Sequence, residues 1–116
     1  MVGEIRTDTS HQFYDFESKY LDGTSTNIVP ADIPHSVADR VREYSVKAFE
    51  AIGGEGFARV DFFLVNDHLV VNEINTIPGF TSFSMFPLLW EASGVPYPEL
   101  IDRLIRLALE RPLGLR

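Results

Sequence analysis

FARVDFFLVNDHLVVNEINTIPGFT, which is residues 57–81, is the stretch of sequence that decides the fold. It contains two runs rich in β-branched and aromatic residues, 57–65 and 69–76. The polar residues Asn66, Asp67 and His68 separate these runs, and this pattern is typical of an antiparallel β-hairpin. We therefore expect the centre of the chain to be a hairpin with a three-residue loop.

The register of this hairpin determines which polar side chains meet. With a loop of 66–68, Asp61 lies opposite Glu73 and Arg59 lies opposite Asn75, so the four side chains share one face. A two-residue turn would instead send Asp61 and Glu73 to opposite faces. The predicted site therefore depends on the three-residue register.

Two carboxylates directly opposite each other repel unless a cation lies between them. Asp61, Glu73 and the amide of Asn75 are hard oxygen donors, which suit Mg²⁺ or Mn²⁺ better than zinc. The alternative is that Arg59 neutralises the two carboxylates in an ion-pair network. Sequence spacing alone leaves both interpretations open.

The segment that follows the hairpin is dense in turn-forming residues. Gly79 could offer a backbone N–H group to an oxyanion, although a Pro-Gly pair is usually only a turn. Ser84 precedes a helical pattern and could be a helix N-cap, an anion ligand, or both. We expect the candidate site to extend from the hairpin into this loop, over 57–85.

The flanking sequence predicts helices on both sides of the hairpin. Apolar spacing indicates helices over 35–52, 84–92 and 97–111, and short strands are expected at 2–6 and 27–29. The polar, aromatic-rich stretch at about 7–27 has no clean period and reads as a long functional loop. The expected class is α/β (α+β), with one small antiparallel sheet backed by the 35–52 and 97–111 helices.

The bulk properties restrict the function further. At 116 residues, the chain suffices for one domain, and a formal net charge of -7 without a basic cluster argues against nucleic acid as a partner. The sequence has no cysteine, no apolar run long enough for a membrane span, and no signal-peptide pattern. We expect a cytoplasmic protein with no membrane partner.

Several ordered blocks of this sequence resemble D-alanine:D-alanine ligases of the ATP-grasp superfamily. The similar blocks cover most of the chain and are FYDFESKY (13–20), PADIP (30–34), GFARVDFF (56–63), NEINTIPGFT (72–81), SMFP (84–87) and WEASG (90–94). The resemblance implies that 1–116 is the C-terminal part of an ATP-grasp ligase. It also implies ATP-dependent joining of two D-alanines through an acyl phosphate, for peptidoglycan precursor synthesis.

The resemblance assigns a role to each matching residue. Asp61, Glu73 and Asn75 would hold two Mg²⁺ ions (or Mn²⁺) that bridge the ATP phosphates, and Arg59 would stabilise the acyl phosphate. Gly79 would donate to the oxyanion of the tetrahedral intermediate. The remaining implied contacts are Ser84 and Met85 with the carboxylate of the second D-alanine, Lys19 and Glu73 with the nucleotide, and Lys19 and Tyr20 with substrate from a mobile ω-loop.

The resemblance also implies partners that this sequence does not contain. Relatives have an N-terminal domain and a central nucleotide-holding domain, and their complete form is often a homodimer. The isolated chain is therefore expected to be inactive. Two alternatives stay open, namely a non-catalytic fragment that binds divalent cations or a partner surface, and part of another ATP-grasp carboxylate–amine ligase.

Overall fold

The computed structural model describes residues 1–7 and 25–112 of the chain. Its elements are β1 (Glu4–Thr7), β2 (Ser25–Ile28), α2 (His35–Ala51), β3 (Arg59–Val65), β4 (His68–Asn75), α3 (Met85–Ala92) and α4 (Tyr97–Glu110). The strands and helices expected from the sequence are confirmed to within two residues at every boundary. Most of the predicted loop at 7–27, with Lys19 and Tyr20, lies outside the described residues.

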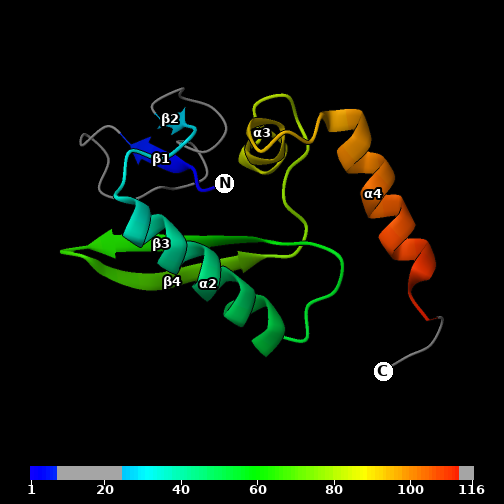
Figure 1. Cartoon of the computed structure of the whole chain (residues 1–116), viewed down its shortest axis with the longest axis horizontal. Helices are drawn as coiled ribbons and strands as arrows, with labels where there is room; N and C mark the ends of the chain where they lie inside the picture. Colours follow the sequence, from blue (N-terminus) through cyan, green and yellow to red (C-terminus); the bar gives the residue numbers. More distant parts are fainter. Residues whose placement is uncertain (8–24, 113–116) are drawn as a thin grey trace.

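The described strands form two small sheets rather than the single sheet expected. β1 pairs antiparallel with β2, with Glu4 opposite Ile28, and β3 pairs antiparallel with β4. Figure 1 shows the β1–β2 pair beside the hairpin, as a separate unit. The expectation of a single sheet is wrong because β1 and β2 form their backbone hydrogen bonds with each other and not with the hairpin.

The turn of the central hairpin contains two residues, so the predicted three-residue loop is wrong. Asn66 and Asp67 both have positive φ, at 48° and 64°, as a type I′ turn requires. His68 belongs to β4 and pairs with Val65. Asn and Asp tolerate this left-handed conformation better than other non-glycine residues, which explains the short turn.

A β-bulge restores the pairing that the short turn would otherwise have prevented. Phe62 lies opposite Val71, whereas the adjacent Asp61 lies opposite Glu73, so Asn72 has no partner on β3. Beyond the bulge, Arg59 lies opposite Asn75. The predicted pairing of the four polar residues is therefore confirmed, but it results from the bulge and not from a three-residue loop.

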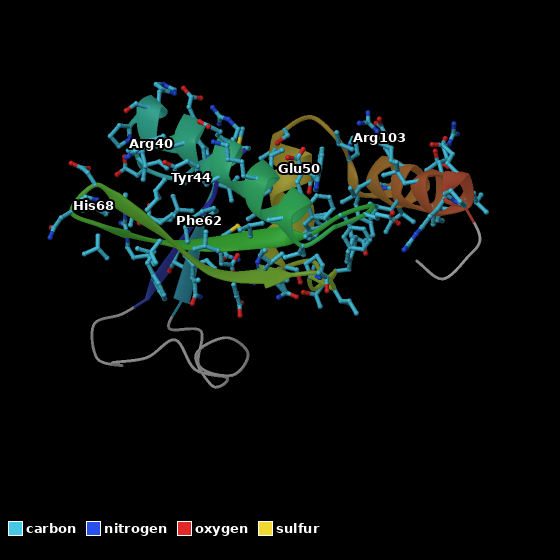
Figure 2. The ribbon with its side chains drawn as sticks, turned by 90° about the horizontal axis from the view of Figure 1, so that it is seen from below. Arg40, Tyr44, Glu50, Phe62, His68 and Arg103 are labelled. Atoms are coloured by element: carbon cyan, nitrogen blue, oxygen red, sulfur yellow. The ribbon has the colours of Figure 1, made fainter. Side chains whose placement is uncertain are left out.

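Helix α2 lies across one face of the hairpin and ends at a glycine motif (Figure 2). Gly53 has φ +64°, and the N–H groups of Gly53 and Gly54 donate to the carbonyls of Glu50 and Phe49. This is the Schellman arrangement, which a glycine in the left-handed conformation makes possible. Arg40 also donates to the carbonyl of Asp67 at 3.1 Å, which fixes α2 to the hairpin turn.

The best-packed region lies where α3 and α4 meet the segments that flank the hairpin. Phe86, Val95 and Leu100 are buried, and Phe57, Phe80 and Leu104 pack against them. The phenylalanine rings of Phe57, Phe80 and Phe86 lie 5.3 to 6.0 Å apart between centroids. We call these three residues the phenylalanine cluster.

Helix α4 does not back the sheet as expected. Its main contacts are with α3, and it extends away from the hairpin (Figure 1). The apolar face of its first half is covered by the buried Val95 and by α3, while Ile105, Leu107 and Leu109 stay exposed. Arg111, directly after the helix, pairs with Glu55 in the segment that leads into β3.

No helix within 1–7 and 25–112 is both long enough and apolar enough to cross a lipid bilayer.

Replacing the most buried side chain should destabilise the chain strongly. Leu100 is 2 % exposed, so Leu100→Ala should lower the free energy of unfolding by about 2 to 4 kcal/mol. Leu109 lies on the same helix and is 80 % exposed, so Leu109→Ala should cost less than about 0.5 kcal/mol. Urea unfolding followed by the fluorescence of the single tryptophan, Trp90, measures both. Equal losses would contradict the core described above.

Candidate functional site

The candidate site lies on the face of the hairpin that points away from α2. Figure 2 shows Phe62 on the side that faces α2, and alternation along β3 places Arg59 and Asp61 on the other side. The bulge brings Glu73 and Asn75 of β4 opposite these two residues. The structure therefore assembles the four polar residues that the sequence predicted.

Arg59 forms a two-pronged ion pair with Asp61. Its Nε and Nη2 atoms donate to Oδ1 and Oδ2 of Asp61, both at 2.8 Å, and Nη2 lies 3.8 Å from Oε1 of Glu73. The Arg59 and Asp61 side chains are 18 % and 22 % exposed, whereas Glu73 is 42 % exposed. The guanidinium of Arg59 thus faces both carboxylates, as expected if Arg59 neutralises Asp61 and Glu73.

The donor set of this face fits a divalent cation bound with the help of a substrate. Asp61, Glu73 and Asn75 would each coordinate a cation through an oxygen atom, which is the ligand atom that Mg²⁺ and Mn²⁺ prefer. Across residues 1–7 and 25–112, nowhere do three histidine, cysteine, aspartate or glutamate side chains gather into a metal-binding group. A cation held by only two carboxylates and an amide needs further oxygen ligands, such as phosphate groups or water.

An apolar continuation of the same face was missed at the sequence level. Phe63 follows Asp61 by two residues, so it lies on the same face, and it is exposed and paired with Val70. Arg59, Asp61, Phe63 and Glu73 are among the residues around a hollow of about 990 Å³, which residues of α2, β1 and α3 also line, so the hollow is not confined to this face. The two-residue spacing of side chains along a strand is the sequence signal that places Phe63 beside Asp61.

The loop after β4 holds Gly79 against Ser84. Pro78 is buried, and Phe80 belongs to the phenylalanine cluster, so both neighbours of Gly79 are anchored. A Cβ atom on Gly79 would lie 2.8 Å from Oγ of Ser84. The absence of a side chain at position 79 is therefore what allows this close approach.

Ser84 precedes α3 without capping the helix through its side chain. Its Oγ accepts a hydrogen bond from the backbone N–H of Thr81 at 3.0 Å and lies 2.8 Å from Oγ1 of Thr81. The first N–H groups of α3, at Met85 and Phe86, consequently receive no cap from Ser84. A helix N-terminus of this kind can bind a carboxylate.

Asn27 connects the other sheet to this loop, and sequence reasoning gave it no role. Its Nδ2 donates to the carbonyl of Phe83 at 3.1 Å, across 56 positions in the chain. No periodicity or local motif signals a contact at that separation. Lys19 and Tyr20, which were also predicted to contact substrate, lie outside the described residues.

Comparison with protein families identifies one match. Residues 1–106 match the family model described as "D-ala D-ala ligase C-terminus". A D-alanine--D-alanine ligase from Kineococcus radiotolerans is 56% identical over 121 aligned residues, which cover 100% of this chain and 32% of that protein. One from Halothermothrix orenii is 60% identical over 85% of this chain and 29% of its own length. The chain thus spans about a third of these relatives.

Solved structures of the same kind share the fold. The D-alanine-D-alanine ligase from Coxiella burnetii is 48% identical with a TM-score of 0.73, covering 75% of this chain and 25% of that one. The VanG D-Ala:D-Ser ligase from Enterococcus faecalis is 37% identical with a TM-score of 0.72, covering 90% and 30%. A Bacillus anthracis D-alanine--D-Alanine ligase complexed with ATP is 31% identical with a TM-score of 0.68, covering 72% and 29%.

Cysteine cross-linking tests the register at the bulge, because the chain has no cysteine of its own. The pair Asp61→Cys and Glu73→Cys should form a disulfide on mild oxidation, since opposed residues have suitable spacing. The pair Val60→Cys and Glu73→Cys, which would be opposed if the register ran uninterrupted from the turn, should not. Mass spectrometry distinguishes the products. Cross-linking of the second pair alone would show that no bulge is present.

A double-mutant cycle tests the contact between Gly79 and Ser84. Gly79→Ala should push the Ser84 hydroxyl away from Thr81, which costs about 0.5 to 2 kcal/mol of stability, and Ser84→Ala should cost a similar amount. Because both changes break the same hydrogen bonds, the double variant should be little worse than either single variant. Urea unfolding of the four proteins measures the cycle. Fully additive losses would show that the two residues are independent.

Proposed function

Since the chain belongs to the D-ala D-ala ligase C-terminus family, we propose that it supplies the metal-binding and acyl-phosphate half of an ATP-dependent D-alanine:D-alanine ligase. The chain spans about a third of its relatives, so the proposal assigns the nucleotide-holding half of the site to protein outside these 116 residues. The observation that carries it is the single face on which Asp61 and Glu73 lie opposite each other with Arg59 between their charges.

The arrangement of the hairpin face supports a nucleotide as one ligand. Asp61, Glu73 and Asn75 would hold Mg²⁺ or Mn²⁺, and a bound cation would offset the negative charge of the ATP phosphates. Phe63 lies next to them and exposes an aromatic ring on the same face. The hairpin face thus suits the phosphate end of ATP.

The other residues of the site suit the two steps of the proposed reaction. In the first step, a carboxylate oxygen of one D-alanine attacks the γ-phosphate, the bond from that phosphorus to ADP breaks, and an acyl phosphate forms. In the second, the amine of another D-alanine attacks the acyl carbon, inorganic phosphate leaves, and the amine loses a proton. Arg59 would donate to the phosphoryl oxygens, and the backbone N–H of Gly79 would donate to the oxyanion.

The N-terminus of α3 suits the second substrate. The N–H groups of Met85 and Phe86 and the hydroxyl of Ser84 would hold its carboxylate, and this role is compatible with the hydrogen bonds between Ser84 and Thr81. Lys19 and Tyr20 would approach the nucleotide and the second substrate from the 7–27 loop. The product would be D-alanyl-D-alanine for peptidoglycan precursors in the cytoplasm, made by a complete enzyme that is a homodimer.

A neighbouring structure supports one alternative within the same class of reaction. The VanG protein from Enterococcus faecalis is described as a D-Ala:D-Ser ligase and has the same fold with 37% identity. The fold therefore accommodates either D-alanine or D-serine as the second substrate. We place D-alanine first because the curated relatives in our comparison that are 56% and 60% identical are named for it.

Removing the charge of Glu73 tests the proposed site in a complete enzyme. The chain would replace the matching segment of the Kineococcus radiotolerans ligase, and phosphate release would be measured with ATP and D-alanine. Glu73→Gln should lower kcat by about 100-fold or more, because a carboxylate that holds the cation is lost. Circular dichroism should remain unchanged.

The matched control is Glu110→Gln, an exposed position at the end of α4 that should leave turnover unchanged. The isolated 116-residue chain should release no phosphate in the same assay. Wild-type turnover in the Glu73→Gln chimera would remove Glu73 from the site. Turnover by the isolated chain would show that the remaining two-thirds of the ligase are dispensable.

A further inference from the structure

The two-pronged contact between Arg59 and Asp61 has a consequence for cation binding. We propose that Arg59 competes with the divalent cation for Asp61, and that phosphate groups release Asp61 by drawing Arg59 to themselves. Cation binding and phosphate binding would then be coupled through one side chain. This inference rests on the proposed function, because it concerns the same cation site.

The geometry of the ion pair supports the competition. Both carboxylate oxygens of Asp61 accept hydrogen bonds of 2.8 Å from the one guanidinium. Each of these hydrogen bonds occupies one lone pair of its carboxylate oxygen, and a cation at the remaining lone pairs would approach a positive charge. Because Arg59 and Asp61 are mostly buried, solvent screens this repulsion less than it would on an open surface.

Glu73 differs from Asp61 in its contact with Arg59 and in its exposure. Its Oε1 lies 3.8 Å from Arg59, beyond hydrogen-bond distance, and its side chain is about twice as exposed as that of Asp61. The two carboxylates are therefore not equivalent towards a cation. Glu73 is the more exposed of the two carboxylates, and Asp61 is the one that forms the two-pronged pair with Arg59.

Phosphate groups can exchange with Asp61 as the partner of Arg59. A planar guanidinium binds phosphate in the same forked geometry that it uses for a carboxylate. Arg59 and Asp61 are two residues apart on one strand, so rotation of the Arg59 side chain can break the pair without moving the backbone. Phosphate would thus both take the positive charge away from Asp61 and add oxygen ligands for the cation.

The competition predicts that removing a positively charged side chain from the site strengthens cation binding. In the 116-residue chain, Arg59→Gln should bind Mn²⁺ about tenfold more tightly than the wild type, as measured by loss of the free-Mn²⁺ signal in electron paramagnetic resonance. Arg106→Gln removes the same charge from an exposed i,i+4 pair on α4 and should change the affinity by less than about twofold. Equal or weaker binding by Arg59→Gln would overturn the inference.

A second variant and a second ligand complete the test. Arg59→Lys keeps the charge without the fork and should bind Mn²⁺ with intermediate affinity, and it provides the test if circular dichroism finds Arg59→Gln unfolded. Inorganic phosphate should tighten Mn²⁺ binding by the wild type and have less effect on Arg59→Gln. Chelation of Mn²⁺ by phosphate is the same for both proteins and cancels in the comparison. An equal effect on both would also overturn the inference.

The double variant Arg59→Gln with Glu73→Gln separates this inference from the proposed function. It should lose the tight Mn²⁺ binding of Arg59→Gln. If none of the proteins binds Mn²⁺, or if the Glu73 change has no effect, the proposed cation site itself is wrong. If Glu73 is required but Arg59→Gln gains nothing over the wild type, the site stands and the competition fails.

Discussion

Packing among three phenylalanine rings holds the candidate site together. Phe57 precedes Arg59 by two residues, Phe80 follows Gly79 directly, and Phe86 follows Ser84 by two residues. Ring centroids 5.3 to 6.0 Å apart bring the start of β3, the loop and the first turn of α3 to one point. The β3–β4 pairing brings the four polar residues of the hairpin together, and this cluster holds the loop with Gly79 and the start of α3 beside them. The polar chemistry therefore depends on an apolar contact beside it.

The sequence predicted those features that follow from local rules. Helix α2 ends where Gly53 allows a left-handed residue, and α3 ends in the same way at Gly94, whose φ is +90°. The pairing of Asp61 with Glu73 was also predicted correctly, but from an incorrect loop. A bulge at Asn72 leaves no distinctive residue pattern, so turn length and register could not be derived separately from the sequence.

Features that depend on distant contacts were not predictable. Nothing local indicates that β1 and β2 pair with each other, that α4 packs on α3, or that Asn27 bonds to the carbonyl of Phe83. The amphipathic pattern of α4 predicts an apolar stripe, but periodicity gives the width of that stripe and not the element it packs against, which is α3 rather than the sheet. Spacing on the strand allows an ion pair of Arg59 with Asp61, but its two-pronged geometry depends on side-chain rotamers that the sequence does not specify.

The bulge at Asn72 also bears on how hairpins of this kind can change in length during evolution. Inserting or deleting one residue at a turn would normally move every side chain of the following strand to the opposite face of the sheet. A bulge adds one residue to one strand and so reverses that exchange for all positions on its far side. A change of one residue in the turn and the gain or loss of a bulge can therefore cancel. Sequence alignments that place a gap at the turn can hide this compensation, since the site stays intact while its distance from the turn changes.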